Sequence, residues 1–277
     1  MSDHEVVTTR SGARAMLDRA TGQVMHPVVG PLAEAEELYV APSRLAERLS
    51  APAREPLVVL DVGLGAGSNA VAAWRVSEAR AGGRVMEIVS FDRTVAALAL
   101  ALEPDHAPAF GLDGPAGAAA RALLADGCHA TPRTTWRLVL GDLPGALSAT
   151  ALAADVVFWD PFSPSANPDL WSLAAFAALR SRCGDRATVH TYSAATSTRA
   201  AMLLAGFAVG AGASTGTMGQ TTVGAIDPAD LAQPLDRRWL DRLRRSSAPL
   251  PVDAPVDAFD RIAAMRQFVS WPPVPDL

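Results

Sequence analysis

The chain has 277 residues, of which 49% are hydrophobic and 19% charged, a balance that is typical of a globular protein and excludes a disordered one. The net charge is −5 and every basic side chain is an arginine, which argues against a protein that coats nucleic acid non-specifically but leaves room for a local basic patch. No apolar run is long enough to cross a bilayer, and the first ten residues hold no apolar signal segment, so we expect a cytoplasmic protein without membrane contact.

The two cysteines, Cys128 and Cys183, lie far apart in the sequence, and neither belongs to a Cys-x-x-Cys pair. The five histidines do not have the spacing of metal ligands. We therefore expect two buried free thiols and no structural metal.

Residues 1–31 alternate polar and apolar positions between glycines and prolines, which predicts strands and turns with a hairpin among them. Residues 32–49 have apolar positions near helical spacing, and Pro42 interrupts the predicted helix. We interpret residues 1–55 as strands and a helix that cover the functional site.

Residues 56–227 alternate predicted strands with predicted helices, which is typical of an α/β, Rossmann-like domain with a mostly parallel sheet covered on both faces. Seven segments are predicted strands: 57–60, 85–91, 135–140, 155–159, 188–192, 207–213 and 221–226. Helices are predicted from about 70 to 79, at 94–102, directly after Asp142, at 169–181 and at 196–205, and residues 104–132 are predicted to be a loop-rich insert. No helix separates the last two strands, which predicts an antiparallel hairpin at one edge.

Prolines interrupt residues 228–277 between two short helical patterns, at 235–245 and 258–268. This pattern predicts a Pro-rich helical tail packed on the domain, not a second domain. Five arginines lie in the first pattern: Arg237, Arg238, Arg242, Arg244 and Arg245. Such a run is most often a solvated helix face, but it is also the obvious candidate for contact with phosphate groups.

The predicted strand 57–60 is followed by a glycine-rich turn and a helix, the arrangement of a nucleotide site. Glycines at Gly63, Gly65 and Gly67 let the backbone turn tightly and approach a ligand, although they can also serve the turn alone. Ser68 fits the dinucleotide fingerprint poorly. The acid before the loop, Asp61, suits a ligand with a positive centre, such as the methionine end of S-adenosylmethionine.

Acids also follow the next strands of the predicted sheet. Asp92 is placed to accept both ribose hydroxyls, Asp142 to accept from an adenine amino group, and Asp160 lies after the fourth strand. One such acid is more often a helix cap, but four at the ends of four consecutive strands favour a ligand site. We also expect the neighbouring Gly67, Asn69, Arg93 and Leu143 in the donor site.

The segment 160–171, DPFSPSANPDLW, resembles the D-G-F-x-P-x-x-N-P-x-x-W pattern of the methyltransferase domain of bifunctional MnmC-type tRNA-modification enzymes. Other segments agree in the same order: GPLAEAEELYV at 30–40, the glycine loop with the helix after it at 61–74, and TYSAATSTRAAMLLAGF at 191–207. The resemblance covers roughly residues 23–226. It implies a class I methyltransferase fold, S-adenosylmethionine as methyl donor, and the aminomethyl group of a wobble uridine in tRNA as acceptor.

The sequence departs from the family pattern in ways that concern the acceptor. Ala166 replaces a lysine that often precedes Asn-Pro, and the family's basic stretch near the end of the domain is here GTMGQTTVG at 216–224. We expect a stand-alone form without the FAD-dependent oxidase half. A methyltransferase for another amine or small molecule therefore stays open, as does a catalytically silent nucleoside-binding relative, whereas an NAD-dependent oxidoreductase disagrees with the glycine spacing.

Methyl transfer to an amine needs positioning more than activation, because the donor is already reactive. Asp160 is the candidate catalytic residue, since a carboxylate can orient the amine and stabilise its developing positive charge. Phe162 is expected to stack on a flipped-out base, and Asn167 to bind the substrate or hold its loop. Tyr39 and Glu34 are expected to bind the substrate from a lid over the donor. His26 and Trp171 are interpreted as structural residues, and Tyr192 as either core or site.

Overall fold

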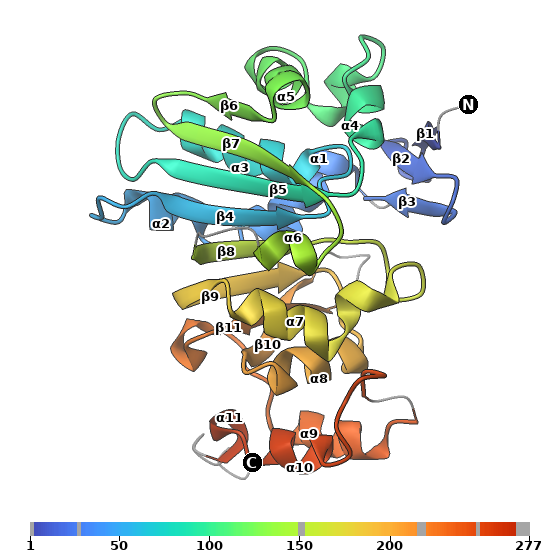
Figure 1. Cartoon of the computed structure of the whole chain (residues 1–277), viewed down its shortest axis with the longest axis vertical. Coiled ribbons are helices and arrows are strands. Elements are labelled where there is room, and N and C mark those ends of the chain that lie inside the picture. The colour runs from blue at the N-terminus through green and yellow to red at the C-terminus, as the bar shows by residue number, and fades with distance from the viewer. Residues whose placement is uncertain (1–2, 27–28, 149–152, 215–219, 248–249, 270–277) are drawn as a thin grey trace.

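The computed structural model describes residues 3–26, 29–148, 153–214, 220–247 and 250–269. Its centre is an eight-stranded sheet (Figure 1). In spatial order the strands are β10 (Ala208–Ser214), β11 (Gln220–Ala225), β9 (Cys183–Thr191), β8 (Ala154–Trp159), β4 (Leu57–Val62), β5 (Met86–Asp92), β7 (Thr134–Leu140) and β6 (Cys128–Ala130). The five strands from β9 to β7 are parallel, and β10 and β11 form the antiparallel edge hairpin that the sequence predicts.

The predicted number of seven strands is wrong by one, because β6 pairs with β7 as an antiparallel strand at the opposite edge. The predicted loop-rich insert is also wrong: it contains a short 3₁₀ helix, η2 (Ala107–Phe110), and the three-turn helix α5 (Pro115–Asp126). Its density of glycine and proline suggested a loop, but Gly114 and Pro115 lie at the start of α5 and Gly127 at its end. At those positions the two residue types delimit a helix.

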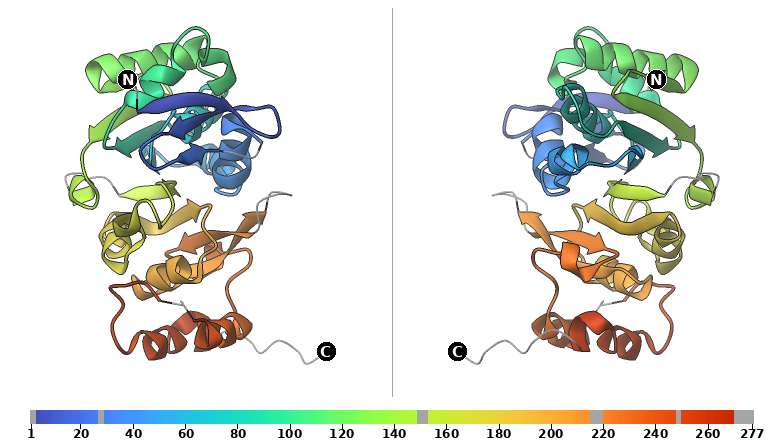
Figure 2. Two further views of the ribbon diagram at one scale, coloured as in Figure 1. Left: turned by 90° about the vertical axis from the view of Figure 1, so that its right-hand side faces the viewer. Right: turned by 90° about the vertical axis from the view of Figure 1, so that its left-hand side faces the viewer.

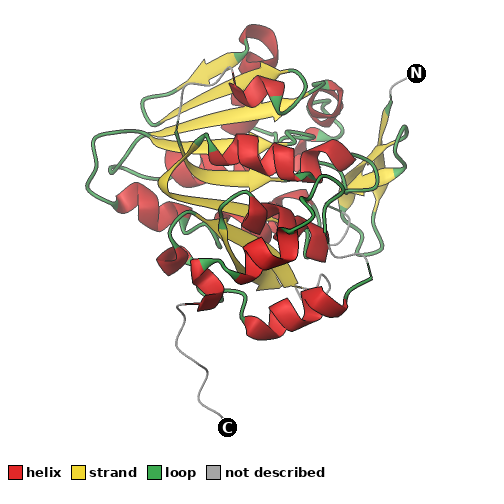
Figure 3. Cartoon of the chain, turned by 60° about the horizontal axis from the view of Figure 1, so that its bottom comes forward, coloured by secondary structure: helices red, strands yellow, loops and turns green. Residues whose placement is uncertain are grey.

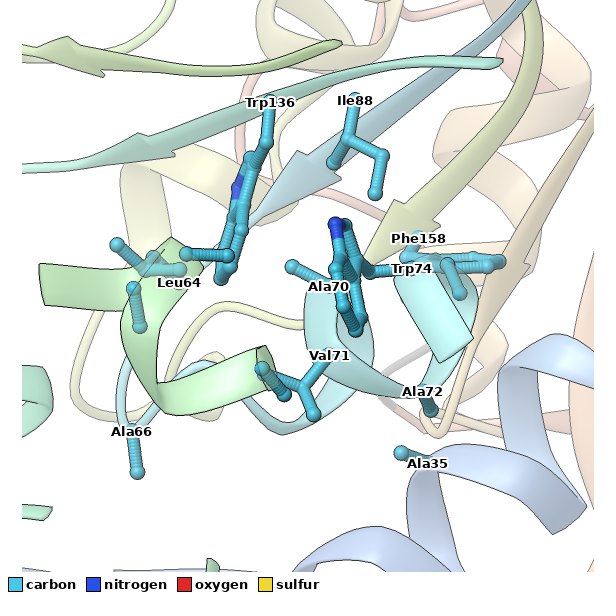
Figure 4. Packing of buried hydrophobic residues seen from close by; sticks show 14 of the residues in the cluster. Ala35, Leu64, Ala66, Ala70, Val71, Ala72, Trp74, Ile88, Trp136 and Phe158 are labelled. Carbon is cyan, nitrogen blue, oxygen red and sulfur yellow. The ribbon is translucent and has the colours of Figure 1, made fainter. Parts of the chain in front are cut away.

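Strand β4 occupies the middle of the sheet, and all six of its residues are buried. Alternate side chains point to opposite faces, so Val59 belongs to one hydrophobic cluster and Leu60 to the other. On the face of Val59, Trp74 and Val71 of α3 (Ser68–Glu78) pack near Trp136 of β7, as Figure 4 shows. A rigid sheet buried on both faces holds the ends of its strands in fixed positions.

The helices cover the two faces. The face of the sheet that carries Val59 is covered by α1 (Pro31–Ala35), the π-helix η1 (Glu36–Val40), α2 (Leu45–Ser50), α3, α4 (Ala96–Ala101) and α5. The face that carries Leu60 is covered by α6 (Gly145–Ser148), the 3₁₀ helix η3 (Pro168–Trp171), α7 (Leu173–Arg180) and α8 (Thr196–Leu204). The predicted helix 32–49 is thus divided, and its break at residues 41–44 includes Pro42.

Residues before α1 form a separate three-stranded antiparallel sheet of β1 (His4–Thr8), β2 (Arg14–Asp18) and β3 (Gln23–Met25), one strand more than the predicted hairpin. Figure 1 shows this small sheet at the side where the parallel strands end, and the left view of Figure 2 shows it in front of the central sheet. The N-terminal sheet therefore covers the carboxyl edge of the domain.

After β11 and the 3₁₀ turn η4 (Pro228–Asp230), the chain forms α9 (Arg237–Arg245), α10 (Ala258–Ala263) and α11 (Arg266–Val269). Figure 1 shows these three helices at the bottom of the molecule, the part that Figure 3 turns toward the viewer. Gln267 attaches this part to the sheet, since its side chain accepts from the Val209 amide and donates to the carbonyls of Val209 and Leu235. The last predicted tail residues, 270–277, lie outside the described residues.

The prediction of two buried thiols is wrong for Cys128, which is exposed on the edge strand β6. Cys183 is partly buried at the start of β9, and burial raises the pKa of its thiol to about 12. Within the described part of the chain, none of the helices combines the length and apolar character needed to span a bilayer.

Candidate active site

Strand β4 lies between β5 and β8. The next strands in the sequence, β5 and β7, lie on one side of β4, and the later strands β8 and β9 lie on its other side. In open α/β sheets, ligands bind at the carboxyl edge beside such a switch in strand order. A cavity of about 420 Å³ opens at this place, between the ends of β4, β5 and β8 and the N-terminal sheet. A cavity of that size suits a nucleoside-sized ligand.

The cavity brings together most of the site residues predicted from the sequence. Those that line it are Glu34, Tyr39, Gly63, Gly65, Asp92, Arg93, Leu143, Asp160, Phe162 and Asn167. They come from five separate segments of the chain, and only the fold makes them neighbours.

Gly63 begins the glycine loop at the end of β4. Its φ is +91°, and a Cβ added there would lie 2.5 Å from the carbonyl oxygen of Asp160. Its amide donates to the carbonyl of Phe91 over 3.0 Å. Only glycine permits both this backbone conformation and this close approach of two strand ends.

Asp92, the last residue of β5, is held by backbone amides. Its Oδ2 accepts from Gly65 over 3.0 Å, and its Oδ1 accepts from Arg93 over 2.7 Å. The Thr94 amide also donates to Oδ1, over 3.3 Å, so Oδ2 is the oxygen with a further lone pair that can accept from a ligand hydroxyl. Its position at the wall of the cavity agrees with the expected contact to a ribose.

Asp160, directly after β8, accepts two hydrogen bonds within the cavity wall. Tyr39 donates its hydroxyl to Oδ1 over 2.5 Å, and Asn69 donates its amide to Oδ2 over 2.8 Å. Burial raises the pKa of the Asp160 carboxyl, while His26 and the two hydrogen bonds act in the opposite direction. Burial and the neighbouring Asp160 charge raise the pKa of Tyr39, which keeps its hydroxyl a donor.

Four predicted donor-site residues do not line the cavity: Asp61, Gly67, Asn69 and Asp142. Gly67, with a φ of +85°, directly precedes α3, and Asn69 in the first turn of that helix donates to Asp160. Asp142 lies between two residues that line the cavity, Gly141 and Leu143, but its side chain is 78% exposed and pairs with Arg93 over 2.5 Å.

Asp61 lies behind the glycine loop in the interior of the sheet. Its Oδ2 accepts from the Ser90 hydroxyl over 2.7 Å, and that hydroxyl accepts from the Trp136 indole over 2.9 Å. Burial raises the pKa of the Asp61 carboxyl to about 7, although the hydrogen bond from Ser90 opposes the change. Since Asp61 does not line the cavity, a change at Asp61 can affect ligand binding only by changing the position of the glycine loop.

The loop after Asp160 is held by residues of the core. Trp171 donates its indole N–H to the carbonyl of Phe162 over 2.8 Å, and Tyr192 donates to the carbonyl of Pro161 over 3.0 Å. Trp171 is buried, which confirms its predicted core position, whereas Tyr192 also lines the cavity.

Sequence reasoning predicted that residues 1–55 cover the site, but it missed which side chains of the N-terminal sheet line the cavity. His4, Asp18, Thr21, Gln23, Met25 and His26 also line the cavity. Gln23 forms two hydrogen bonds with Ser163, one from its amide to the hydroxyl and one to its carbonyl from the Ser163 amide. The partners are separated by 140 residues, and no local pattern predicts such a contact.

Comparison with known proteins agrees with this geometry. Residues 122–227 match a family described as S-adenosyl-L-methionine-dependent methyltransferase. The chain is 34% identical over 211 residues to the tRNA 5-methylaminomethyl-2-thiouridine biosynthesis bifunctional protein MnmC of Pseudomonas aeruginosa (strain UCBPP-PA14), with 70% of this chain and 31% of that protein covered. The MnmC protein of Paraburkholderia xenovorans is 30% identical over 254 residues, which cover 83% of this chain and 35% of that protein. The chain thus spans about a third of the length of these curated relatives.

Among solved structures, the crystal structure of MnmC2 from Aquifex aeolicus has the same fold. It aligns over 95% of this chain and 84% of that chain, with a TM-score of 0.70 and 23% sequence identity. The shared fold, the cavity at the switch point and the similar sequences agree with one another. The chain is therefore related to the S-adenosyl-L-methionine-dependent methyltransferases through residues 122–227, and over most of its length it is similar to part of the MnmC proteins.

Proposed function

We propose that the chain transfers a methyl group from S-adenosylmethionine to the aminomethyl group of a wobble uridine in tRNA. The observation that carries the proposal is the Asp160 carboxylate, held in the cavity wall by Tyr39 and Asn69 next to the glycine loop. A carboxylate fixed in this way can accept an N–H of the incoming amine and stabilise the positive charge that grows on nitrogen.

The residues present suit the donor. The bare backbone at Gly63 and Gly65 lines the cavity, and Asp92 offers acceptors for a ribose. When bound, S-adenosylmethionine supplies a sulfonium methyl that an amine nitrogen can attack in line. We assign donor contact to Gly63, Gly65, Asp92, Arg93 and Leu143, and acceptor contact to Phe162, Asn167 and Asp160.

Support for tRNA as acceptor comes from the curated relatives, whose name states tRNA 5-methylaminomethyl-2-thiouridine biosynthesis. The net charge of −5 favours a small amine instead, unless a local patch contacts phosphates. On α9, Arg237 donates to the carbonyl of Phe268 and Arg244 lies over the ring of Phe259. The exposed Arg238, Arg242 and Arg245 follow one helix face and are available for phosphate contact.

The decisive experiment incubates the purified chain with labelled S-adenosylmethionine and tRNA from cells that lack this methylation. We expect label in the wobble nucleoside. Asp160→Asn should lose most of this turnover, whereas Asp169→Asn, an exposed acid of the same loop, should keep it. Absence of transfer to this tRNA, with donor binding intact, would reject tRNA and favour a small amine.

A second measurement tests the basic patch. Replacing Arg238, Arg242 and Arg245 by serine should raise the KM for tRNA and flatten its dependence on salt, because fewer counterions are released. Donor affinity should not change. Unchanged salt dependence in this variant would remove α9 from the proposed tRNA surface.

A further inference from the structure

His26 follows β3 and extends its imidazole between two acids of the cavity. Its Nε2 lies 3.5 Å from Oδ2 of Asp160, and its Nδ1 lies 3.9 Å from Oε2 of Glu34. The side chain of His26 is 12% exposed, compared with 15% for Asp160 and 3% for Glu34. The imidazole is therefore largely withdrawn from solvent but lines the proposed acceptor cavity.

The backbone at His26 has a φ of +51°, in the left-handed region that side chains other than glycine seldom adopt. Such conformations occur where surrounding structure imposes them, and they gather at functional sites. Here the strained residue directs its ring at Asp160.

The Glu34 carboxylate is fixed in the orientation that faces His26. Its Oε1 accepts from the amides of Val29 over 2.8 Å and Gly30 over 3.3 Å at the start of α1. Its other oxygen faces Nδ1 of the imidazole. Negative charge on both sides of the ring stabilises the positive charge that the ring carries after it accepts a proton.

An amine acceptor is an ammonium ion near neutral pH and must lose a proton before it attacks. We infer that His26 accepts this proton, which makes it a further catalytic residue of the proposed amine methylation. This inference rests on the proposed function. Asp160 is less suited to the role, because the hydrogen bonds from Tyr39 and Asn69 stabilise its unprotonated form.

The step balances as follows. His26 takes one proton from the ammonium, the freed nitrogen pair bonds to the methyl carbon, and the carbon–sulfur bond breaks with its electrons left on sulfur. The product is a secondary ammonium, and His26 returns its proton to solvent.

Besides Asp160 and Glu34, the titratable or charged groups on the walls of the same cavity are His4, Asp18, Tyr39, Asp92, Arg93 and Tyr192.

The test compares pH–rate profiles of methyl transfer to undermethylated tRNA. His26→Asn retains a residue that tolerates the left-handed backbone, so it should fold. At pH 7 we expect kcat to fall about a hundredfold with unchanged donor affinity, and the deficit to shrink toward pH 9.5, where solvent itself deprotonates the amine. The matched control is His106→Asn, since His106 lies outside the cavity beside Glu103.

A second variant separates chemistry from structure. His26→Gly suits the backbone and leaves space for added imidazole, which should restore a large part of the rate. A deficit that is equal at every pH and is not rescued by imidazole would overturn the assignment, as would full activity of His26→Asn. If the parent protein binds the donor but methylates neither tRNA nor a small primary amine, the proposed function fails and this inference fails with it.

Discussion

The contact between the glycine loop and the Asp160 segment makes a quantitative prediction for Gly63→Ala. The new methyl group would lie 2.5 Å from the Asp160 carbonyl oxygen and 2.9 Å from its carbon, at a φ of +91°. Left-handed backbone costs a side chain about 1–2 kcal/mol, and displacing packed backbone costs about 1–3 kcal/mol more. We expect a total loss of about 2–5 kcal/mol and a Tm lower by roughly 5–20 °C.

Gly206→Ala is the matched control for this change. Gly206 has a φ of +93°, but nothing lies within 4 Å of an added Cβ. It should lose only the backbone contribution, about 1–2 kcal/mol. The difference between the two variants measures the close approach of the loop to Asp160.

Urea unfolding of both variants gives the two free energies, and calorimetric titration gives their affinity for S-adenosylmethionine. Gly63→Ala should also bind the donor more weakly, because relief of the clash moves one cavity wall. Equal unfolding free energies for the two variants, together with donor affinity as in the parent, would refute the reasoning.

Three further predictions concern the acids and thiols. Because the folded state raises the pKa of Asp61 from 3.8 to about 7, it holds a proton that the unfolded chain releases, so the free energy of unfolding should fall by up to about 4 kcal/mol as pH rises from 4 to 7. Urea unfolding at several pH values should show that Asp61→Asn lacks this fall in the free energy of unfolding. If the variant and the parent depend on pH in the same way, the raised pKa of the buried carboxyl is contradicted. Asp92→Ala should weaken donor binding by about 1–3 kcal/mol in calorimetry, whereas Asp142→Ala should bind the donor as the parent does. If Asp142→Ala binds the donor more weakly than Asp92→Ala, the roles of the two acids are exchanged. A thiol reagent should modify exposed Cys128 rapidly and Cys183 only on unfolding. Rapid modification of both thiols in the folded protein would contradict the burial of Cys183 at the start of β9.

Local sequence determined much of the architecture and one part of the site. The alternation of apolar runs with helical patterns indicated a mostly parallel sheet, because such strands must be buried on both faces. The positions of Asp92 and Asp160 were also predictable, since residues that end parallel strands meet at one edge. Gly63 was predictable for the same reason, as a strand that turns sharply into a helix needs glycine.

Tertiary structure alone decided what each of these residues touches. Asp61 and Asp142 both lie near the carboxyl ends of their strands, yet Asp61 is buried inside β4 behind the loop and Asp142 is exposed beside Arg93. His26 is far from Asp160 in sequence, and the fold of the N-terminal sheet places its ring 3.5 Å from that carboxylate. The ends of strands are marked by a local pattern of apolar residues, whereas contacts between distant segments depend on packing of the whole domain, which no local pattern encodes.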